Sequence, residues 1–352
     1  SPAFNVREKL TELGRRFGLK GSELAAAETV QEARDLVSAG RKNFIINGDF
    51  KVWQRGTSGG VGNGNRTYKS ADRWFNFNAG DSTSQLDLSS VNIGGVTGRF
   101  RYGMRVSGGQ SSRILGQCIE GPLPAGDYVF SAWVRFSEIP QNFYMTHNST
   151  ALTGENNFAG WYGGSGTSIS YTKPDNIDEV AQTGVWYHVY KKFTAVSPHL
   201  GLGIAFQPVF PASTSATFDV TGVQVEMGKN ATEFEHRSYG EELALCQRYF
   251  LKTSNAFGSV YESSGNTGNV GLGICFPVEM RVAATNTITS LPTGTANNVH
   301  NFGAGNNSYV AGGTYNGTTR GCQIYLTGGT ARTIGTFSVL NIGAEVSFNA
   351  EL

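Results

Sequence analysis

The chain has 352 residues, with 28 Lys and Arg against 27 Asp and Glu, a formal net charge of +1. This balance excludes the concentrated positive charge of nucleic-acid domains and polybasic membrane modules, and no apolar run approaches the roughly 18 residues of a membrane span. Gly is unusually frequent, at 47 residues, while charged residues make up 16% and aromatic residues 12%, a mixture typical of short strands joined by turns.

Residues 1–42 differ from the rest of the chain. Asn5 with Glu8, and Thr29 with Glu32, each place a capping side chain three residues before a Glu, which is typical of helix starts. The apolar residues of this segment are too few for a core of their own. We therefore expect short helices that pack against another protein or, alternatively, against the chain's own sheet.

From Asn43 onward the pattern changes to that of strands. Residues 128–136 are mostly aromatic or β-branched, and residues 217–226 alternate between apolar and polar side chains. Residues 44–50 are predicted to form a short strand that runs into a turn. Further strands are predicted over 73–78, 102–107, 112–120, 126–136, 185–194, 200–206 and 216–227. Such antiparallel strands with turn residues between them predict a mainly β protein, an antiparallel β-sandwich of jelly-roll type.

A third capping pattern, Ser238 with Glu241, predicts a helix over 242–251. Its apolar face, formed by Leu243, Cys246 and Tyr249, is too small for a monomer core, so we expect it near the axis of a homotrimer. Beyond it the chain is rich in Gly, Asn and Thr and predicts a second small β-sandwich. The predicted organisation is a helical N-terminal segment over 1–42, a jelly roll over 43–235, a connecting helix over 236–252 and a distal β-domain over 253–352.

Three stretches resemble, in order and spacing, a domain common in bacteriophage tail-fibre and receptor-binding proteins. Residues 43–57, NFIINGDFKVWQRGT, are similar to its opening, and residues 68–74, YKSADRW, are similar to the element that follows. Residues 223–228, VQVEMG, and 231–249, ATEFEHRSYGEELALCQRY, resemble its closing strand and helix. The resemblance spans over half of the chain.

This resemblance implies a structural virion protein, a subunit of a homotrimeric tail fibre or spike. Its jelly roll would be similar to carbohydrate-binding modules and would recognise polysaccharide on the host surface. Residues 1–42 would attach it to other tail or head proteins. We expect no enzymatic activity, because the chain has no nucleotide-binding loop in the right setting. A capsule-degrading depolymerase, either glycosidase or esterase, and a head fibre or adaptor without a sugar ligand are the alternatives.

Sugar binding needs aromatic faces together with amide and carboxylate side chains, because sugar rings combine C–H faces with a rim of hydroxyls. Trp161 lies in the Gly-rich stretch 154–166, where nothing local would bury it. The candidate carbohydrate-binding residues are Trp161, Tyr162, Asn156, Asn157, Tyr309 and Asn307. A trimer contact, or packing on the neighbouring domain, would equally explain Trp161, and turn geometry would explain the amides. Trp74, Trp133 and Trp186 lie within strand patterns and are expected in the core.

The likeness to carbohydrate-binding jelly rolls also implies a structural Ca²⁺ between the first and last strands. Asp49 and Asp219 match those places and would begin an oxygen shell. The alternative is an Asx turn at Asp49 and a solvated Asp219. The four cysteines, Cys118, Cys246, Cys275 and Cys322, have no metal-binding spacing and are expected as small apolar core residues.

Overall fold

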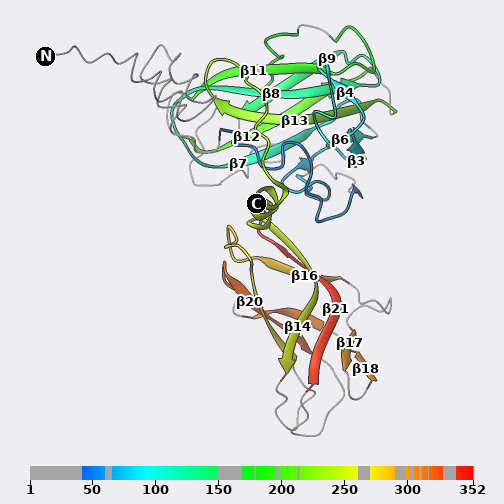
Figure 1. Cartoon of the computed structure of the whole chain (residues 1–352), viewed down its shortest axis with the longest axis vertical. Coiled ribbons are helices and arrows are strands. Elements are labelled where there is room, and N and C mark those ends of the chain that lie inside the picture. The colour runs from blue at the N-terminus through cyan, green and yellow to red at the C-terminus, as the bar shows by residue number, and fades with distance from the viewer. Residues whose placement is uncertain are drawn as a thin grey trace, which may run out of the picture. The chain divides into compact units, whose positions relative to one another are not determined.

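The computed structural model describes residues 42–59, 66–108, 110–148, 169–177, 180–195, 199–211, 215–260, 270–289, 298–301, 305–308, 311–315, 317–327 and 338–351 (Figure 1). The chain divides into two compact units, Ser1–Phe44 and Ile45–Leu352, and the following account concerns the second. The helices expected in residues 1–42 fall outside the described residues, apart from Lys42. The domain limits drawn from the sequence stay predictions.

Two antiparallel sheets form a sandwich (Figure 1). The first sheet contains, in spatial order, β1 (Ser58–Gly59), β3 (Ser82–Asp87), β6 (Tyr102–Ser107), β13 (Thr217–Met227), β8 (Gly126–Phe136) and β11 (Tyr187–Ala195). The second contains β10 (Ile169–Ser170), β9 (Asn142–Asn148), β12 (His199–Val209), β7 (Leu115–Leu123) and β2 (Phe75–Asn76). A hairpin of β4 (Asn92–Ile93) and β5 (Val96–Thr97) stands apart. The chain passes repeatedly between the two sheets, and this confirms the predicted jelly roll.

Aromatic side chains fill the space between the sheets. Phe130 on β8 packs on Phe206 of β12 with ring centroids 4.8 Å apart, and Phe136 packs edge-on against Phe143 at 5.1 Å. All four rings are buried. Burying one such side chain contributes about 1.5–3 kcal/mol, so this layer is a main source of the sandwich's stability. It also explains why alternate residues of β8 are apolar.

The strand predicted at the start of residues 44–50 is wrong, whereas the turn into which it was expected to run is present. Residues 46–49 form bends and a turn instead, and two residues adopt positive φ, Asn47 at 59° and Phe50 at 53°. The Asn47 side chain stabilises this turn, because its amide donates to the carbonyls of Val52 at 2.8 Å and Asp72 at 3.0 Å. An apolar run is therefore held in a non-repetitive conformation by contacts that are distant in sequence.

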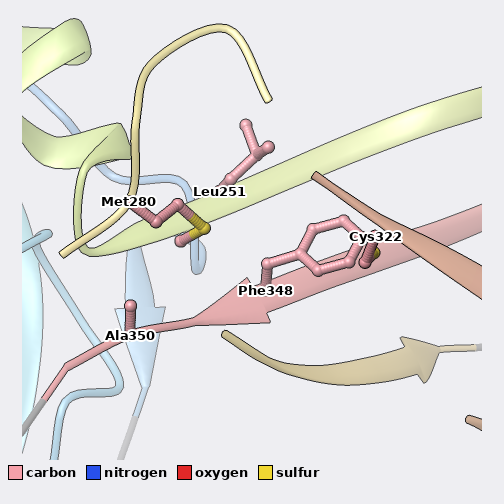
Figure 2. Close-up of a cluster of buried hydrophobic side chains, with 5 residues drawn as sticks. All are labelled: Leu251, Met280, Cys322, Phe348 and Ala350. Atoms are coloured by element: carbon pink, nitrogen blue, oxygen red, sulfur yellow. The ribbon is translucent and has the colours of Figure 1, made fainter. Parts of the chain in front are cut away.

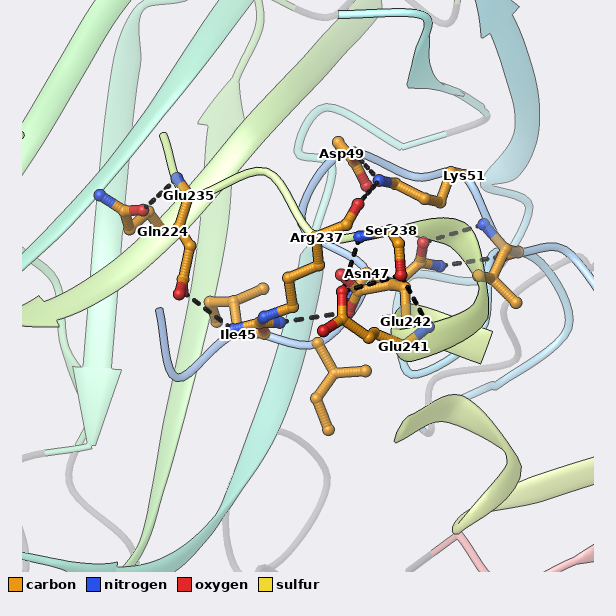
Figure 3. Close-up of polar contacts among 12 residues, drawn as sticks. Ile45, Asn47, Asp49, Lys51, Gln224, Glu235, Arg237, Ser238, Glu241 and Glu242 are labelled. Carbon is orange, nitrogen blue, oxygen red and sulfur yellow. Dashed lines mark hydrogen bonds and ion pairs between the residues drawn. The ribbon is translucent and has the colours of Figure 1, made fainter. Parts of the chain in front are cut away.

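The three stretches that carry the sequence resemblance meet around Asn47. The Asn47 carbonyl accepts a hydrogen bond from Trp74 Nε1 at 2.9 Å, and its N–H donates to Glu242 Oε1 at 2.6 Å. Arg237 also contacts Glu242, at 3.3 Å (Figure 3). Because Asn47, Trp74 and Glu242 are all buried, these motif residues hold the fold together rather than face a ligand.

The capping box at Ser238 and Glu241 is confirmed. The Glu241 N–H donates to Ser238 Oγ at 3.3 Å, and Glu241 Oε2 accepts from the Ser238 N–H at 2.9 Å (Figure 3). Helix α4 (Tyr239–Gln247) ends earlier than predicted, because the next strand begins at Phe250. Cys246 and Tyr249 are buried within the chain itself, so their burial gives no reason for a trimer axis here. The homotrimer stays a prediction.

The C-terminal part contains two further antiparallel sheets. One has the order β14 (Phe250–Val260), β21 (Ser338–Asn349), β17 (Asn298–Asn301) and β18 (Gly305–Ser308), with β16 (Thr285–Thr289) also paired to β21. The other contains β15 (Val270–Cys275), β20 (Gly321–Thr327) and β19 (Ala311–Tyr315). Between them lies a buried cluster of Leu251, Met280, Cys322, Phe348 and Ala350 (Figure 2). The expected second small β-sandwich is confirmed.

The four cysteines are all free. Cys118, Cys246 and Cys322 are buried, as expected for small apolar core residues, whereas Cys275 at the end of β15 is exposed. Burial raises the pKa of the Cys118 and Cys246 thiols, which keeps them protonated and unreactive near neutral pH.

Candidate functional site

The outer face of the first sheet carries charged side chains that the sandwich core does not use. Asp219 on β13 lies opposite Arg105 of β6 and Arg135 of β8 in the strand register. Its carboxylate accepts from Arg105 Nε at 2.7 Å and from Arg135 Nη2 at 2.7 Å. The bond to Asp219 raises the pKa of Arg105. One buried carboxylate thus binds two partly exposed guanidinium groups across three strands.

Two segments cover another part of this face. The β4–β5 hairpin brings Gly94 against the ring of Trp133 on β8. The second segment, residues 231–236, is hydrogen-bonded to β13. Glu226 accepts from the Thr232 N–H at 2.8 Å and from Thr232 Oγ1 at 2.6 Å. Gln224 accepts from the Glu235 N–H at 2.9 Å (Figure 3). Buried polar groups of β13 therefore position the cover.

A pocket of about 250 Å³ lies between the sheet and this cover, and we call it the aromatic pocket. Its apolar walls include Trp133, whose ring lies 5.0 Å from that of His188, and Phe100, which packs edge-on against Phe234 at 5.3 Å. Burial lowers the pKa of His188, which favours the neutral imidazole. Polar groups complete the lining: Arg99, Ser131, Gln224, Thr232, Glu233 and His236.

A second pocket, of about 510 Å³, adjoins the first, and we call it the cationic pocket. The two share Arg99, Phe100 and His236 in their linings. The other residues that line it include Asp49, Lys51, Arg101, Tyr102 and Tyr239. Tyr239, at the start of α4, is 57% exposed, which leaves an aromatic surface accessible to a ligand.

This combination of groups suits a polyhydroxylated ligand. Aromatic surfaces accept the C–H face of a sugar ring, whereas amide, hydroxyl and carboxylate groups exchange hydrogen bonds with its hydroxyls. The aromatic pocket supplies both kinds of group within one cavity. Polar groups placed around an aromatic wall fix a ligand's orientation.

Most of the candidate sugar-binding residues cannot be placed. Trp161, Tyr162, Asn156, Asn157 and Tyr309 fall outside the described residues, and Asn307 lies in β18. All six stay predictions.

The tryptophans expected in the core divide into two groups. Trp74 is fully buried, as expected. Trp133 and Trp186 are only partly buried and lie on the outer face of the first sheet, so their expected place in the sandwich core is wrong. The signal was present in the sequence: Phe130, Ala132 and Val134 point inward, and with a period of two Trp133 must then point outward.

The surroundings of the two predicted calcium ligands do not fit a divalent cation. Asp219 is engaged by Arg105 and Arg135, and Asp49 Oδ2 pairs with Lys51 Nζ at 2.7 Å. Ca²⁺ requires six to eight oxygens and repels neighbouring cations. Within the described part of the chain, no three His, Cys, Asp or Glu side chains gather in a way that could hold a metal ion.

The fold and its pockets define a mainly β, antiparallel jelly-roll protein. Among the described residues, no helix is long and apolar enough to cross a membrane. No model of a known protein family and no curated protein matches the sequence.

Solved structures with a similar arrangement include carbohydrate-binding modules and a phage domain. The CBM22-1 xylan-binding domain of Paenibacillus barcinonensis Xyn10C is 10% identical over 49% of this chain and 99% of that domain, with a TM-score of 0.31. TmCBM61, in complex with β-1,4-galactotriose, is 13% identical over 53% of this chain and 99% of that module, with a TM-score of 0.29. The tailspike protein 4 enzymatically active domain of bacteriophage CBA120 is 9% identical over 53% of this chain and 22% of that chain, with a TM-score of 0.31. Likeness at this level gives no ground for assigning a family, a ligand or an activity.

Proposed function

We propose that this chain is a non-catalytic glycan-binding protein and that the aromatic pocket is its binding site. The observation that carries the proposal is the position of Trp133, which is turned away from the sandwich core into a pocket rimmed by Gln224, Thr232 and Glu233. A sugar ring would stack on an aromatic wall, and its hydroxyls would bond to the amide and carboxylate groups.

The sequence resemblance extends this proposal to a biological setting. The chain would be a structural virion protein, a homotrimeric tail fibre or spike that recognises host-surface polysaccharide. Residues 1–42 would attach it to tail or head proteins. Mass measurement in solution tests the trimer. An image of the particle with this protein labelled tests its place on the virion, and its absence from purified particles would contradict the setting.

Binding to an array of bacterial surface polysaccharides tests the proposed activity. We expect the full chain to bind at least one polysaccharide, and Trp133→Ala to lose that binding. Trp53→Phe is the matched control, because Trp53 lies outside both pockets and its Nε1 donates to the Phe50 carbonyl at 2.6 Å. Thermal unfolding of both variants shows whether they remain folded.

The outcomes separate the alternatives. Binding that survives Trp133→Ala in a folded variant would move the site elsewhere on the chain. A chain that binds no polysaccharide would favour a head fibre or adaptor. Release of reducing sugar or of acetate from a bound polysaccharide would reassign the protein as a glycosidase or esterase.

A further inference from the structure

The cationic pocket has an excess of positive charge. Its lining includes three cationic side chains, Lys51, Arg99 and Arg101, against one carboxylate, Asp49. Within the described part of the chain, the ion pair of the Arg99 guanidinium is long, 3.4 Å from a Glu233 carboxylate that is 88% exposed, and its hydrogen bond to the Gly94 carbonyl is 3.5 Å long. Such a pair is worth little in water. The pocket is therefore suited to a ligand that carries negative charge.

Arg101 is the most available of these cations. Its side chain is exposed, and within the described part of the chain no ion pair engages its guanidinium, which lies 5.2 Å from the ring centroid of Tyr102. A guanidinium presents paired N–H donors that match the two oxygens of a carboxylate. Arg101 can thus accept an anionic group without breaking an existing ion pair.

Asp49 supplies a hydrogen-bond acceptor in the same pocket. Its Oδ2 is held by Lys51 Nζ at 2.7 Å, and Lys51 in turn donates to the Arg237 carbonyl at 2.7 Å (Figure 3). The other carboxylate oxygen of Asp49, Oδ1, is buried and has no hydrogen-bond partner within the described part of the chain. A buried acceptor without a donor is costly, so the pocket wall lacks an O–H or N–H donor at this point.

We propose that the cationic pocket binds an acidic sugar residue, one that carries a carboxylate as well as hydroxyls. The carboxylate would pair with Arg101, a hydroxyl would donate to Asp49 Oδ1, and Tyr239 would offer an aromatic face. This inference rests on the proposed function, because the two pockets share Arg99, Phe100 and His236 and would hold adjacent residues of one glycan. It makes the ligand an acidic polysaccharide.

A paired array tests the inference with the full chain. Each acidic bacterial polysaccharide is printed in its native form and after chemical reduction of its carboxyl groups to alcohols, beside neutral polysaccharides. We expect binding to native acidic polymers and a loss of about tenfold or more in affinity after reduction, since a hydrogen bond to a charged group is worth about one to two factors of ten.

Two variants locate the effect. Arg101→Gln should weaken binding to the native acidic polymer about tenfold and remove the difference between native and reduced forms. Arg320→Gln is the control, because Arg320 is a highly exposed arginine outside the pocket, paired with Glu279 at 3.3 Å. Arg320→Gln should change the affinity for neither form of the polymer. An equal loss of affinity in both variants would show that general surface charge, rather than the pocket, causes the effect.

The two proposals fail in different ways. Binding that is equal for native and reduced polymers, or confined to neutral polymers and unaffected by Arg101→Gln, would overturn the acidic-sugar inference and leave the glycan-binding function standing. Binding to no polymer would overturn both.

Discussion

The ring of Phe100 occupies the place that a side chain at Gly222 would need. A Cβ on Gly222 would come 2.4 Å from Phe100 Cζ, and the residue has a φ of +59° at the register shift in β13. Both the backbone conformation and the close approach require glycine here. Gly222 therefore helps to set the wall of the aromatic pocket.

Gly222→Ala should destabilise the chain by about 3 kcal/mol, the sum of a left-handed alanine and an overpacked contact. Gly184→Ala is the matched comparison, since Gly184 has a φ of +73° but nothing within 4 Å of an added Cβ. It should cost only about 1 kcal/mol. Urea unfolding measures both, and equal losses would show that packing on Phe100 contributes nothing.

Glu242→Ala tests the junction around Asn47. The substitution leaves the buried Asn47 N–H without its acceptor and removes the ion pair between Arg237 and Glu242, while that between Arg237 and Glu235 remains, so we expect a loss of about 3 kcal/mol. Glu279→Ala is the control, because its pair with Arg320 is exposed and screened by water and should contribute little to stability. The free energy of unfolding from denaturant titration distinguishes the two, and comparable losses would contradict the structural role of Glu242.

Glu351→Ala tests the contact between the chain's C-terminal end and the jelly roll. Glu351 pairs with the buried guanidinium of Arg73, which also lies 3.5 Å from the ring centroid of Tyr249. Removing the carboxylate leaves a buried cation uncompensated, at a cost of about 3 kcal/mol or more. We expect a lower midpoint in denaturant and a smaller effect for Glu351→Gln, which keeps an acceptor. An unchanged midpoint for Glu351→Ala would show that the pair is not formed in solution.

The contribution of two buried aspartates to stability should fall as the pH rises from about 4 to about 7. Asp81 is fully buried 3.7 Å from Arg113, and burial raises its pKa to about 7. Burial likewise raises the pKa of Asp72 to about 7. In the unfolded chain both titrate near about 4, so between these values the folded state holds more protons and loses stability with each rise in pH.

Asp81→Asn removes one of these titrations. We expect the melting temperature of the variant, relative to that of the wild-type chain, to rise between pH 5 and pH 8, because the variant lacks the loss of stability that the ionisation of Asp81 causes. Asp72 contributes equally in both chains. Scanning calorimetry across the range measures this. If the melting temperature of the variant changes with pH as that of the wild-type chain does, Asp81 keeps an ordinary pKa in the folded chain.

Local patterns were enough to predict several elements in full. The strands over Tyr102–Ser107 and Gly126–Phe136 and the capping box at Ser238 follow from side-chain alternation and from a cap within one turn of helix. These signals are local because each depends on neighbours along a single strand or helix turn. The mainly β class and the two sandwiches follow from the same patterns.

Local patterns in the sequence predicted most of the strands and the buried face of each. The groups that cover the opposite face depend on contacts between distant segments, which local patterns do not reveal. The 44–50 run became a turn because Trp74 and Glu242 bind Asn47, and Trp133 became a pocket wall because residues near Gly94 and Phe234 cover it. These contacts join residues that are far apart in the chain. A periodic pattern of apolar residues predicts which face of a strand is buried, but it does not identify the distant group that buries it.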